Sequence, residues 1–166
     1  ERVAFVLHDM FDLPFEDIAP IVGRTPAAAR QLASRARRRV KGARPDDGAD
    51  AARRQQIVTA FLAASKSGDL AALLRVLDPD GKLGADAVAA RMGGVSELRG
   101  ADAVAAIFKG RAQAARPAVI DGAPGFAVIF QGQLRIAVVL SFAGERIAGI
   151  EAFADPLRLR TMEVAL

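Results

Sequence analysis

The chain has 166 residues, of which 52% are hydrophobic and 25% charged, which indicates one ordinary domain, or a small domain joined to a larger one, and argues against disorder throughout. It contains no Cys, no Tyr, no Trp and a single His, so disulfides and thiolate nucleophiles are excluded and most acid–base and metal sites lack their residues. No apolar run approaches the roughly 20 residues of a membrane-spanning helix, so we expect a protein that acts by binding, with no membrane partner, metal or cofactor.

Basic residues are concentrated near the amino end. Residues 1–44 hold nine Lys and Arg against five acids, whereas residues 45–166 hold fourteen of each. Eight of the nine bases, and no acid, lie between Arg24 and Arg44. This distribution is typical of a polyanion-binding unit attached to a neutral one, although a solvated basic helix has the same composition.

Three helices are predicted at the amino end. Apolar residues at helical spacing predict the first over residues 1–10 and the second over residues 15–22. Gly23 is predicted to end the second helix in a left-handed conformation, and Thr25 to cap a third helix that begins at Pro26. Two short helices joined by a three-residue turn, the second basic on its outer face, are typical of a helix-turn-helix unit that binds DNA.

Residues 43–52 concentrate Gly, Pro and Asp and are interpreted as a linker. Beyond them the apolar spacing first predicts helices, and then changes to a period of two, which predicts strands. An α+β domain over residues 53–166 is therefore predicted, with a curved antiparallel sheet packed on its helices. The predicted helices are 53–67, 69–77, 101–115 and a short one after Pro156; the predicted strands are 82–91, 117–121, 126–131, 134–142 and 146–154, with turns at 78–81 and 122–125.

Residues 1–42 resemble region 4 of the extracytoplasmic-function sigma factors, the bacterial RNA polymerase subunits that direct promoter choice, most specifically in residues 21–37. The resemblance implies that the third helix enters the major groove of the promoter −35 element. Arginine can pair with guanine and glutamine with adenine. Arg30→Ala is therefore expected to relax sequence preference, and Arg38→Ala to weaken binding to all sequences alike. The implied DNA-binding residues are Arg24, Thr25, Ala28, Arg30, Gln31, Ser34, Arg35 and Arg38.

The same resemblance implies a second partner, core RNA polymerase, for which the apolar Val6, Leu7 and Phe11 are the candidate contact. It also implies that the chain is a piece of a longer polypeptide, with region 2 ahead of Glu1, which is not a Met. The sequence shows no export signal, so we expect a cytoplasmic location.

The segment from about Arg53 resembles the SnoaL-like (NTF2-like) cone, notably in residues 60–64, 77–80, 99–104 and 154–156. Together the two parts resemble a sigma factor with this domain as an extension. The resemblance implies that the cone regulates the sigma domains by intramolecular contacts. Two family signatures are reduced in this chain, to residues 91–94 and 155–159.

Two other functions are compatible with the residues. A one-component regulator would sense a ligand through the cone, and a cyclase-like or isomerase-like enzyme would use a carboxylate base. Asp86, Asp102, Glu151 and Asp155 are the available bases, but without Tyr we expect no enzyme and no catalytic residue. A ligand-binding pocket and a filled core remain open alternatives for six phenylalanines: Phe61, Phe108, Phe126, Phe130, Phe142 and Phe153.

Overall fold

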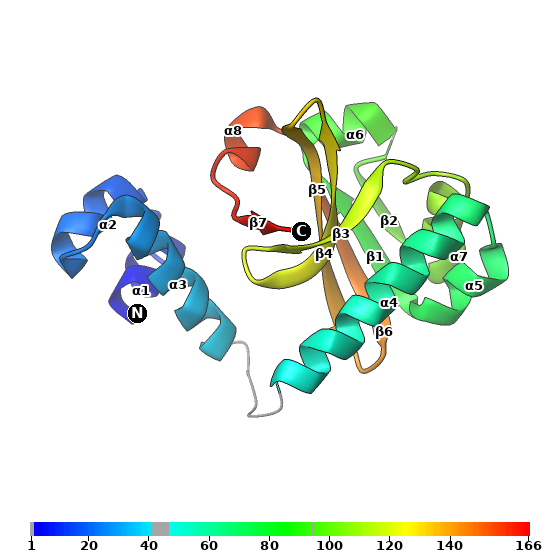
Figure 1. The fold of residues 1–166 in the computed structure, drawn as a ribbon, viewed down its shortest axis with the longest axis horizontal. Helices are drawn as coiled ribbons and strands as arrows, with labels where there is room; N and C mark the ends of the chain where they lie inside the picture. Colours follow the sequence, from blue (N-terminus) through cyan, green and yellow to red (C-terminus); the bar gives the residue numbers. More distant parts are fainter. Residues whose placement is uncertain (1, 41–46, 94) are drawn as a thin grey trace. The chain divides into compact units, whose positions relative to one another are not determined.

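The computed structural model describes residues 2–40, 47–93 and 95–166, and the side chains of residues 37–40 and 47–49 are outside that description. The chain divides into two compact units, Glu1–Asp47 and Gly48–Leu166 (Figure 1). Each unit has a buried core of its own, so each is treated separately below.

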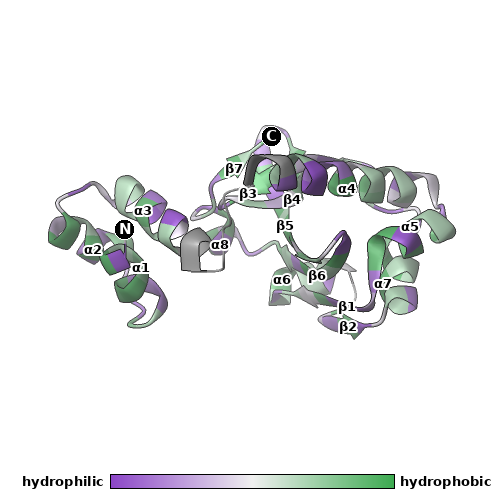
Figure 2. Cartoon of the chain, turned by 90° about the horizontal axis from the view of Figure 1, so that it is seen from below, coloured by the Kyte–Doolittle hydropathy of each residue, from purple (hydrophilic) through white to green (hydrophobic). Residues whose placement is uncertain are grey.

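Three helices form the first unit, as the sequence predicts: α1 (Arg2–Asp9), α2 (Phe15–Val22) and α3 (Pro26–Val40). Figure 2 shows α1 and α2 largely hydrophobic and α3 more hydrophilic. Alanine dominates the centre of this unit, and its small side chain allows helices to approach closely. The buried residues are Ala4, Ile18, Ala19, Ala29 and Ala33.

A seven-stranded sheet organises the second unit, in the order β2-β1-β6-β5-β4-β3-β7. Consecutive strands from β3 to β6 pair antiparallel, as predicted, whereas β1 pairs with β6 in parallel. The strands are β1 (Leu77–Ala85), β2 (Glu97–Arg99), β3 (Ala115–Ile120), β4 (Ala123–Phe130), β5 (Gln133–Ala143), β6 (Arg146–Phe153) and β7 (Val164–Ala165).

Helices cover one face of this sheet. Helices α4 (Asp47–Ser67), α5 (Leu70–Val76) and α7 (Ala101–Phe108) lie on that side in Figure 1, and their apolar residues join those of the sheet in the main core. The other face carries a smaller cluster, in which the short helix α8 (Pro156–Leu159) contributes Leu159. The predicted fold class is confirmed: an all-α unit followed by an α+β unit with an antiparallel meander.

Several predicted boundaries in the second unit are wrong. Residues 87–91, predicted as strand, belong to helix α6 (Ala87–Gly93), because the Asp86 carboxylate accepts a hydrogen bond from the Ala89 N–H and caps a run of helix-forming alanines. The predicted turn at 78–81 lies within β1, at a shift in register. Helix α4 begins at Asp47 rather than at 53, inside the segment interpreted as a linker.

The helix predicted over residues 101–115 ends at Phe108. Its continuation turns away because Gly110 and Ala112 adopt positive φ angles of 74° and 59°. The hydroxyl of the fully buried Ser65 shares its one hydrogen between two carbonyl oxygens, that of Phe108 at 2.6 Å and that of Arg111 at 3.1 Å. Helix α4 therefore holds this bend through a side chain distant in sequence. Strands β2 and β7 and helix α6 are absent from the predicted elements, and each is short.

Candidate DNA-binding interface

The turn between α2 and α3 is built by two caps. Gly23 ends α2 with a φ of 64°, and the following Arg24 N–H donates to the Ala19 carbonyl at 2.9 Å, which is the pattern of a left-handed helix end. The Thr25 side chain then accepts a hydrogen bond from the Ala28 N–H at 3.2 Å, as predicted for an N-cap. These bonds fix the direction in which α3 leaves the turn.

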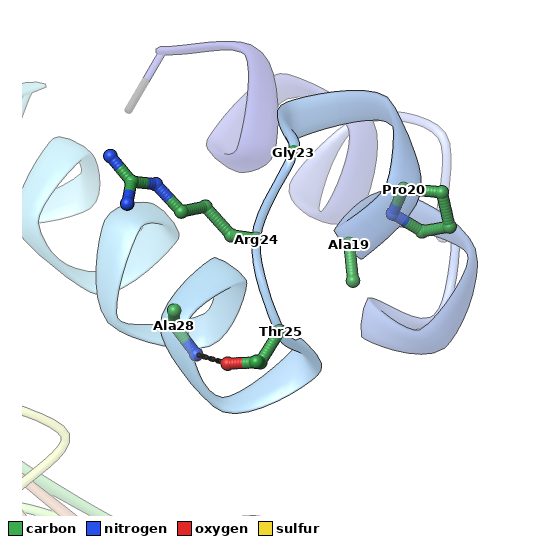
Figure 3. A pocket seen from close by; sticks show the side chains of 6 residues that line it. All are labelled: Ala19, Pro20, Gly23, Arg24, Thr25 and Ala28. Atoms are coloured by element: carbon green, nitrogen blue, oxygen red, sulfur yellow. Dashed lines mark hydrogen bonds between the residues drawn. The ribbon is translucent and has the colours of Figure 1, made fainter.

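A shallow hollow of about 420 Å³ lies at this turn. Figure 3 shows Ala19 and Pro20 on α2, Arg24 and Thr25 in the turn, and Ala28 in the first turn of α3. The start of the basic helix α3 therefore lines an open hollow on the surface.

One stripe of α3 faces away from the core. Ala28, Gln31 and Arg35 are spaced i, i+3 and i+7, the spacing of residues on one helical face. Gln31 and Arg35 are exposed and Ala28 is half-buried, whereas Ala29, Ala33 and Ala36 are buried. Arg24 and Thr25 are exposed at the turn that precedes this stripe. We call these five residues the recognition face: Arg24, Thr25, Ala28, Gln31 and Arg35.

Arg30 lies outside the recognition face. Its guanidinium carbon is 5.3 Å from the centre of the Phe15 ring, and its buried Nε has no hydrogen-bond partner among the described residues. The single histidine, His8, stacks on the same ring at 4.1 Å between ring centres, and its Nδ1 lies 3.0 Å from the Leu13 carbonyl oxygen. Arg30 is thus part of a stack that joins all three helices.

Of the two remaining predicted DNA contacts, the structure describes the side chain of Ser34 alone. Ser34 is buried, with 8% of its surface exposed, so the structure does not bring it to the outside of α3. Arg38 belongs to the last turns of α3, and its side chain lies outside the described residues. The sequence could not separate Ser34 from the recognition face because polar residues occupy both flanks of the helix.

Of the three side chains predicted to contact the polymerase, only Phe11 is exposed. Leu7 packs on the helical core and Val6 is half-buried, whereas Phe11 is 67% exposed. Val3 and Met10, which the candidate contact omitted, are 53% and 72% exposed. Their spacing with Val6, at i, i+3 and i+7, is a signal for one shared face of α1, but spacing alone does not say which face points outward.

The six phenylalanines do not come together. Phe61, Phe108 and Phe126 pack on one another, with ring centres 5.0 to 6.3 Å apart, and Phe142 packs against the same core. Phe130 is 60% exposed. Phe153 joins the cluster on the opposite face of the sheet, with the Arg158 guanidinium 5.2 Å from its ring. Mutual packing of the central rings favours the filled-core alternative.

The four carboxylates considered as catalytic bases are found at helix starts, in hydrogen bonds with the backbone, or exposed on a strand. Burial raises the pKa of Asp86, but hydrogen bonds from the backbone N–H groups of Ala89, Asp155, Ala154 and Val88 outweigh it, so that its pKa lies below the ordinary value. Asp155 caps α8 by accepting from the Leu157 N–H at 2.9 Å. Asp102 lies in the first turn of α7, where a negative charge is favourable, and Glu151 is exposed on β6.

No group of three or more Asp, Glu or His side chains among the described residues could hold a metal ion. No helix within the same ranges is both long enough and apolar enough to cross a membrane.

Comparison with known proteins finds similarity along the whole chain. Residues 1–40 match the family model "Sigma-70, region 4". Over its whole length the chain is 31% identical to "Probable ECF RNA polymerase sigma factor SigI" of Mycobacterium tuberculosis (strain CDC 1551 / Oshkosh), of which it covers 57%. The structure is also similar to the crystal structure of the M. tuberculosis extracytoplasmic function sigma factor SigJ, with a TM-score of 0.53 and 28% sequence identity. This match covers 96% of the present chain and 59% of the SigJ chain.

Over its whole length the chain is thus similar to extracytoplasmic-function sigma factors. In sequence, SigJ of strain ATCC 25618 / H37Rv is 39% identical over 115 residues, which are 68% of this chain and 36% of SigJ. The chain spans little more than half the length of SigI. The helix-turn-helix matches sigma region 4, and the curved sheet with its helices has the NTF2-like fold.

Proposed function

We propose that this chain acts in transcription initiation, with region 4 recognising the −35 element of a promoter. The recognition face carries the proposal, because it places Gln31 and Arg35 on one exposed stripe of α3 and Arg24 on the exposed turn that precedes this helix. A helix of this kind fits the major groove, where arginine and glutamine can each make paired hydrogen bonds to a base.

The geometry gives the DNA-binding residues different roles. Gln31 and Arg35 are proposed to reach base edges, since they stand on the recognition face. Arg30 is proposed to hold the helices in place, and to reach at most a phosphate, because Phe15 already occupies one side of its guanidinium. Arg38 follows the recognition face by one turn and is proposed to contact phosphate, which leaves sequence preference unchanged.

Core RNA polymerase is the proposed protein partner, together with region 2 of the same full-length chain. The exposed apolar side chains of α1 and the turn after it, Val3, Met10 and Phe11, are the proposed polymerase contact. Several large apolar side chains exposed on one small unit are typical of a protein–protein interface. Cytoplasmic location follows from these proposed partners.

The NTF2-like extension is proposed to regulate the sigma domains rather than to catalyse a reaction. The backbone hydrogen bonds of Asp86 and Asp155 and the packed phenylalanine rings support a structural role for residues that an enzyme would need free. Binding of the same duplex by the whole chain and by residues 1–47 tests regulation through intramolecular contact. A difference in affinity supports the contact, and equal affinities at several salt concentrations contradict it.

Selection from a randomised duplex library tests the proposed DNA recognition. The wild-type chain, with and without core polymerase, is expected to enrich one short motif. Gln31→Ala should lose the preference at one base pair of that motif, and Gln133→Ala, on the other unit, should leave the motif unchanged. Enrichment of no motif by the wild-type chain in either condition would contradict the proposal.

A further inference from the structure

A second hollow lies in the NTF2-like unit, between the start of β5 and helix α8. Its volume is about 390 Å³, which falls within the range of roughly 300–1,000 Å³ found for small-molecule sites. Apolar and polar residues share its lining. The apolar ones are Leu134, Ala154, Pro156 and Leu159, and the polar ones are Gln133, Arg135 and Arg160.

The α8 side of this hollow is held by hydrogen bonds to carboxylates. The Asp86 carboxylate accepts from the N–H groups of Ala154, at 2.9 Å, and Asp155, at 3.0 Å. Asp155 in turn accepts from the Leu157 N–H at 2.9 Å, and Leu159 is 8% exposed within the second apolar cluster. Hydrogen bonds to a charged acceptor are stronger than neutral ones, so this wall is formed before any ligand arrives.

Two guanidinium groups on the hollow are available to a ligand. Arg135 and Arg160 are exposed, and neither has an ion pair or a side-chain hydrogen bond within the ranges that the structure describes. The carboxylates of Asp86 and Asp155, which hold the α8 side of the hollow, accept hydrogen bonds from backbone N–H groups. A guanidinium pairs with a carboxylate or phosphate through two parallel hydrogen bonds.

We infer that this hollow binds a small organic acid, with its anionic group on Arg135 and Arg160 and its apolar body against Leu134 and Leu159. Equal numbers of acids and bases in residues 45–166 make this unit a poor match for an extended polyanion such as DNA. Two guanidiniums that line one hollow together with apolar side chains instead suit a single anionic group with an apolar tail. This inference does not depend on the proposed recognition of DNA.

Titration of the ¹⁵N-labelled whole chain with sodium octanoate, at constant ionic strength, tests the inference. Saturable chemical-shift changes are expected at residues 133–135 and 154–160. Arg135→Gln and Arg160→Gln should each weaken octanoate binding about tenfold, the effect of losing one charge-assisted hydrogen bond pair of about 1.4 kcal/mol. Arg146→Gln removes an exposed arginine at the far end of the same sheet and should leave the affinity unchanged.

Two further probes test separately how the negative charge and the apolar tail contribute to the affinity. Octanamide has the same tail without the charge and should bind at least tenfold more weakly than octanoate; equal binding would overturn the anion site. Inorganic phosphate lacks the tail, and if it binds as tightly as octanoate the assignment of an apolar body is wrong. Shift changes outside the hollow, or equal losses in Arg146→Gln and the two test variants, would overturn the inference. Thermal unfolding of each variant checks that it is folded.

Discussion

The guanidinium carbon of Arg30 lies 5.3 Å from the centre of the Phe15 ring, so the first residue of α2 is joined to the recognition helix by a cation–π contact. His8 of α1 stacks on the same ring. All three helices of region 4 therefore meet at Phe15. Arg30, which the sequence suggests for base recognition, instead packs on Phe15. Gln31 and Arg35, which lie on the recognition face, are the residues proposed to contact bases.

Replacing Phe15 should destabilise region 4. In Phe15→Leu the apolar volume is largely kept, but the cation–π contact and the ring stack are lost, which should cost about 1–2 kcal/mol. Urea unfolding followed by far-ultraviolet circular dichroism measures the change. Phe130→Leu alters a ring that is 60% exposed and should change the free energy of unfolding by less than about 0.5 kcal/mol. Equal effects in the two variants would show that the stack contributes nothing.

Gln31 and Arg30 should differ in how they affect DNA binding. Gln31→Ala should reduce discrimination at one base pair by about 1–3 kcal/mol. Arg30→Ala should weaken specific and scrambled duplexes by the same factor, because it disturbs the scaffold and not a base contact. Fluorescence anisotropy titrations give, for each variant, the ratio of its affinities for the specific and the scrambled duplex. Loss of discrimination in Arg30→Ala, with full discrimination kept in Gln31→Ala, would reverse the proposed roles.

Asp86 should make stability depend on pH at the acid end. Its pKa in the folded protein lies below the ordinary value of 3.8, so the stabilisation is fully present above that value and is lost as pH falls through the folded pKa. Asp86→Asn removes the charged acceptor of four backbone N–H groups and should cost about 2–3 kcal/mol at pH 7.

Urea unfolding of the wild type and of Asp86→Asn, from pH 7 to pH 3, measures this dependence. The gap in free energy of unfolding should stay constant down to about pH 4 and narrow below it. Asp102→Asn alters an exposed carboxylate of the same unit and serves as the control. A gap that stays constant down to pH 3, or one that narrows between pH 5 and 7, is incompatible with the lowered pKa.

Gly125 should not tolerate a side chain. A Cβ atom there would overlap the carbonyl oxygen of Val138 on the neighbouring strand, whereas a Cβ on Gly93 would meet nothing within 4 Å. Gly125→Ala should therefore destabilise the NTF2-like unit by more than about 2 kcal/mol through forced backbone movement. Gly93→Ala should be neutral or slightly stabilising. Thermal unfolding of both variants compares them directly, and similar midpoints would contradict the close approach of β4 and β5.

The caps explain why region 4 could be predicted from its sequence. Gly23, Thr25 and Pro26 mark two helix ends within four residues, and each works through local backbone geometry. In the second unit, by contrast, α7 ends at Phe108 because Ser65, far away in sequence, binds the carbonyls beyond it. Asp86 similarly starts α6 while it holds the end of β6. Such contacts between distant residues leave no periodic signal.

The sequence predicts which helix forms the candidate site, but not which of its side chains face outward. From sequence, Arg30, Gln31, Ser34 and Arg35 are grouped as DNA contacts because all four are polar and follow the same turn. Packing separates them: Ser34 is buried and Arg30 lies over Phe15. The position of Phe15 at the start of α2 decides the orientation of Arg30, and no pattern within α3 contains that information.

Chemical-shift mapping of the whole chain with a duplex selected from the randomised library tests whether the recognition face binds DNA. The largest changes are expected at Arg24, Thr25, Ala28, Gln31 and Arg35, and changes in the NTF2-like unit should be smaller. Changes that spare the recognition face, or that centre on the sheet of the second unit, would contradict DNA binding by this face.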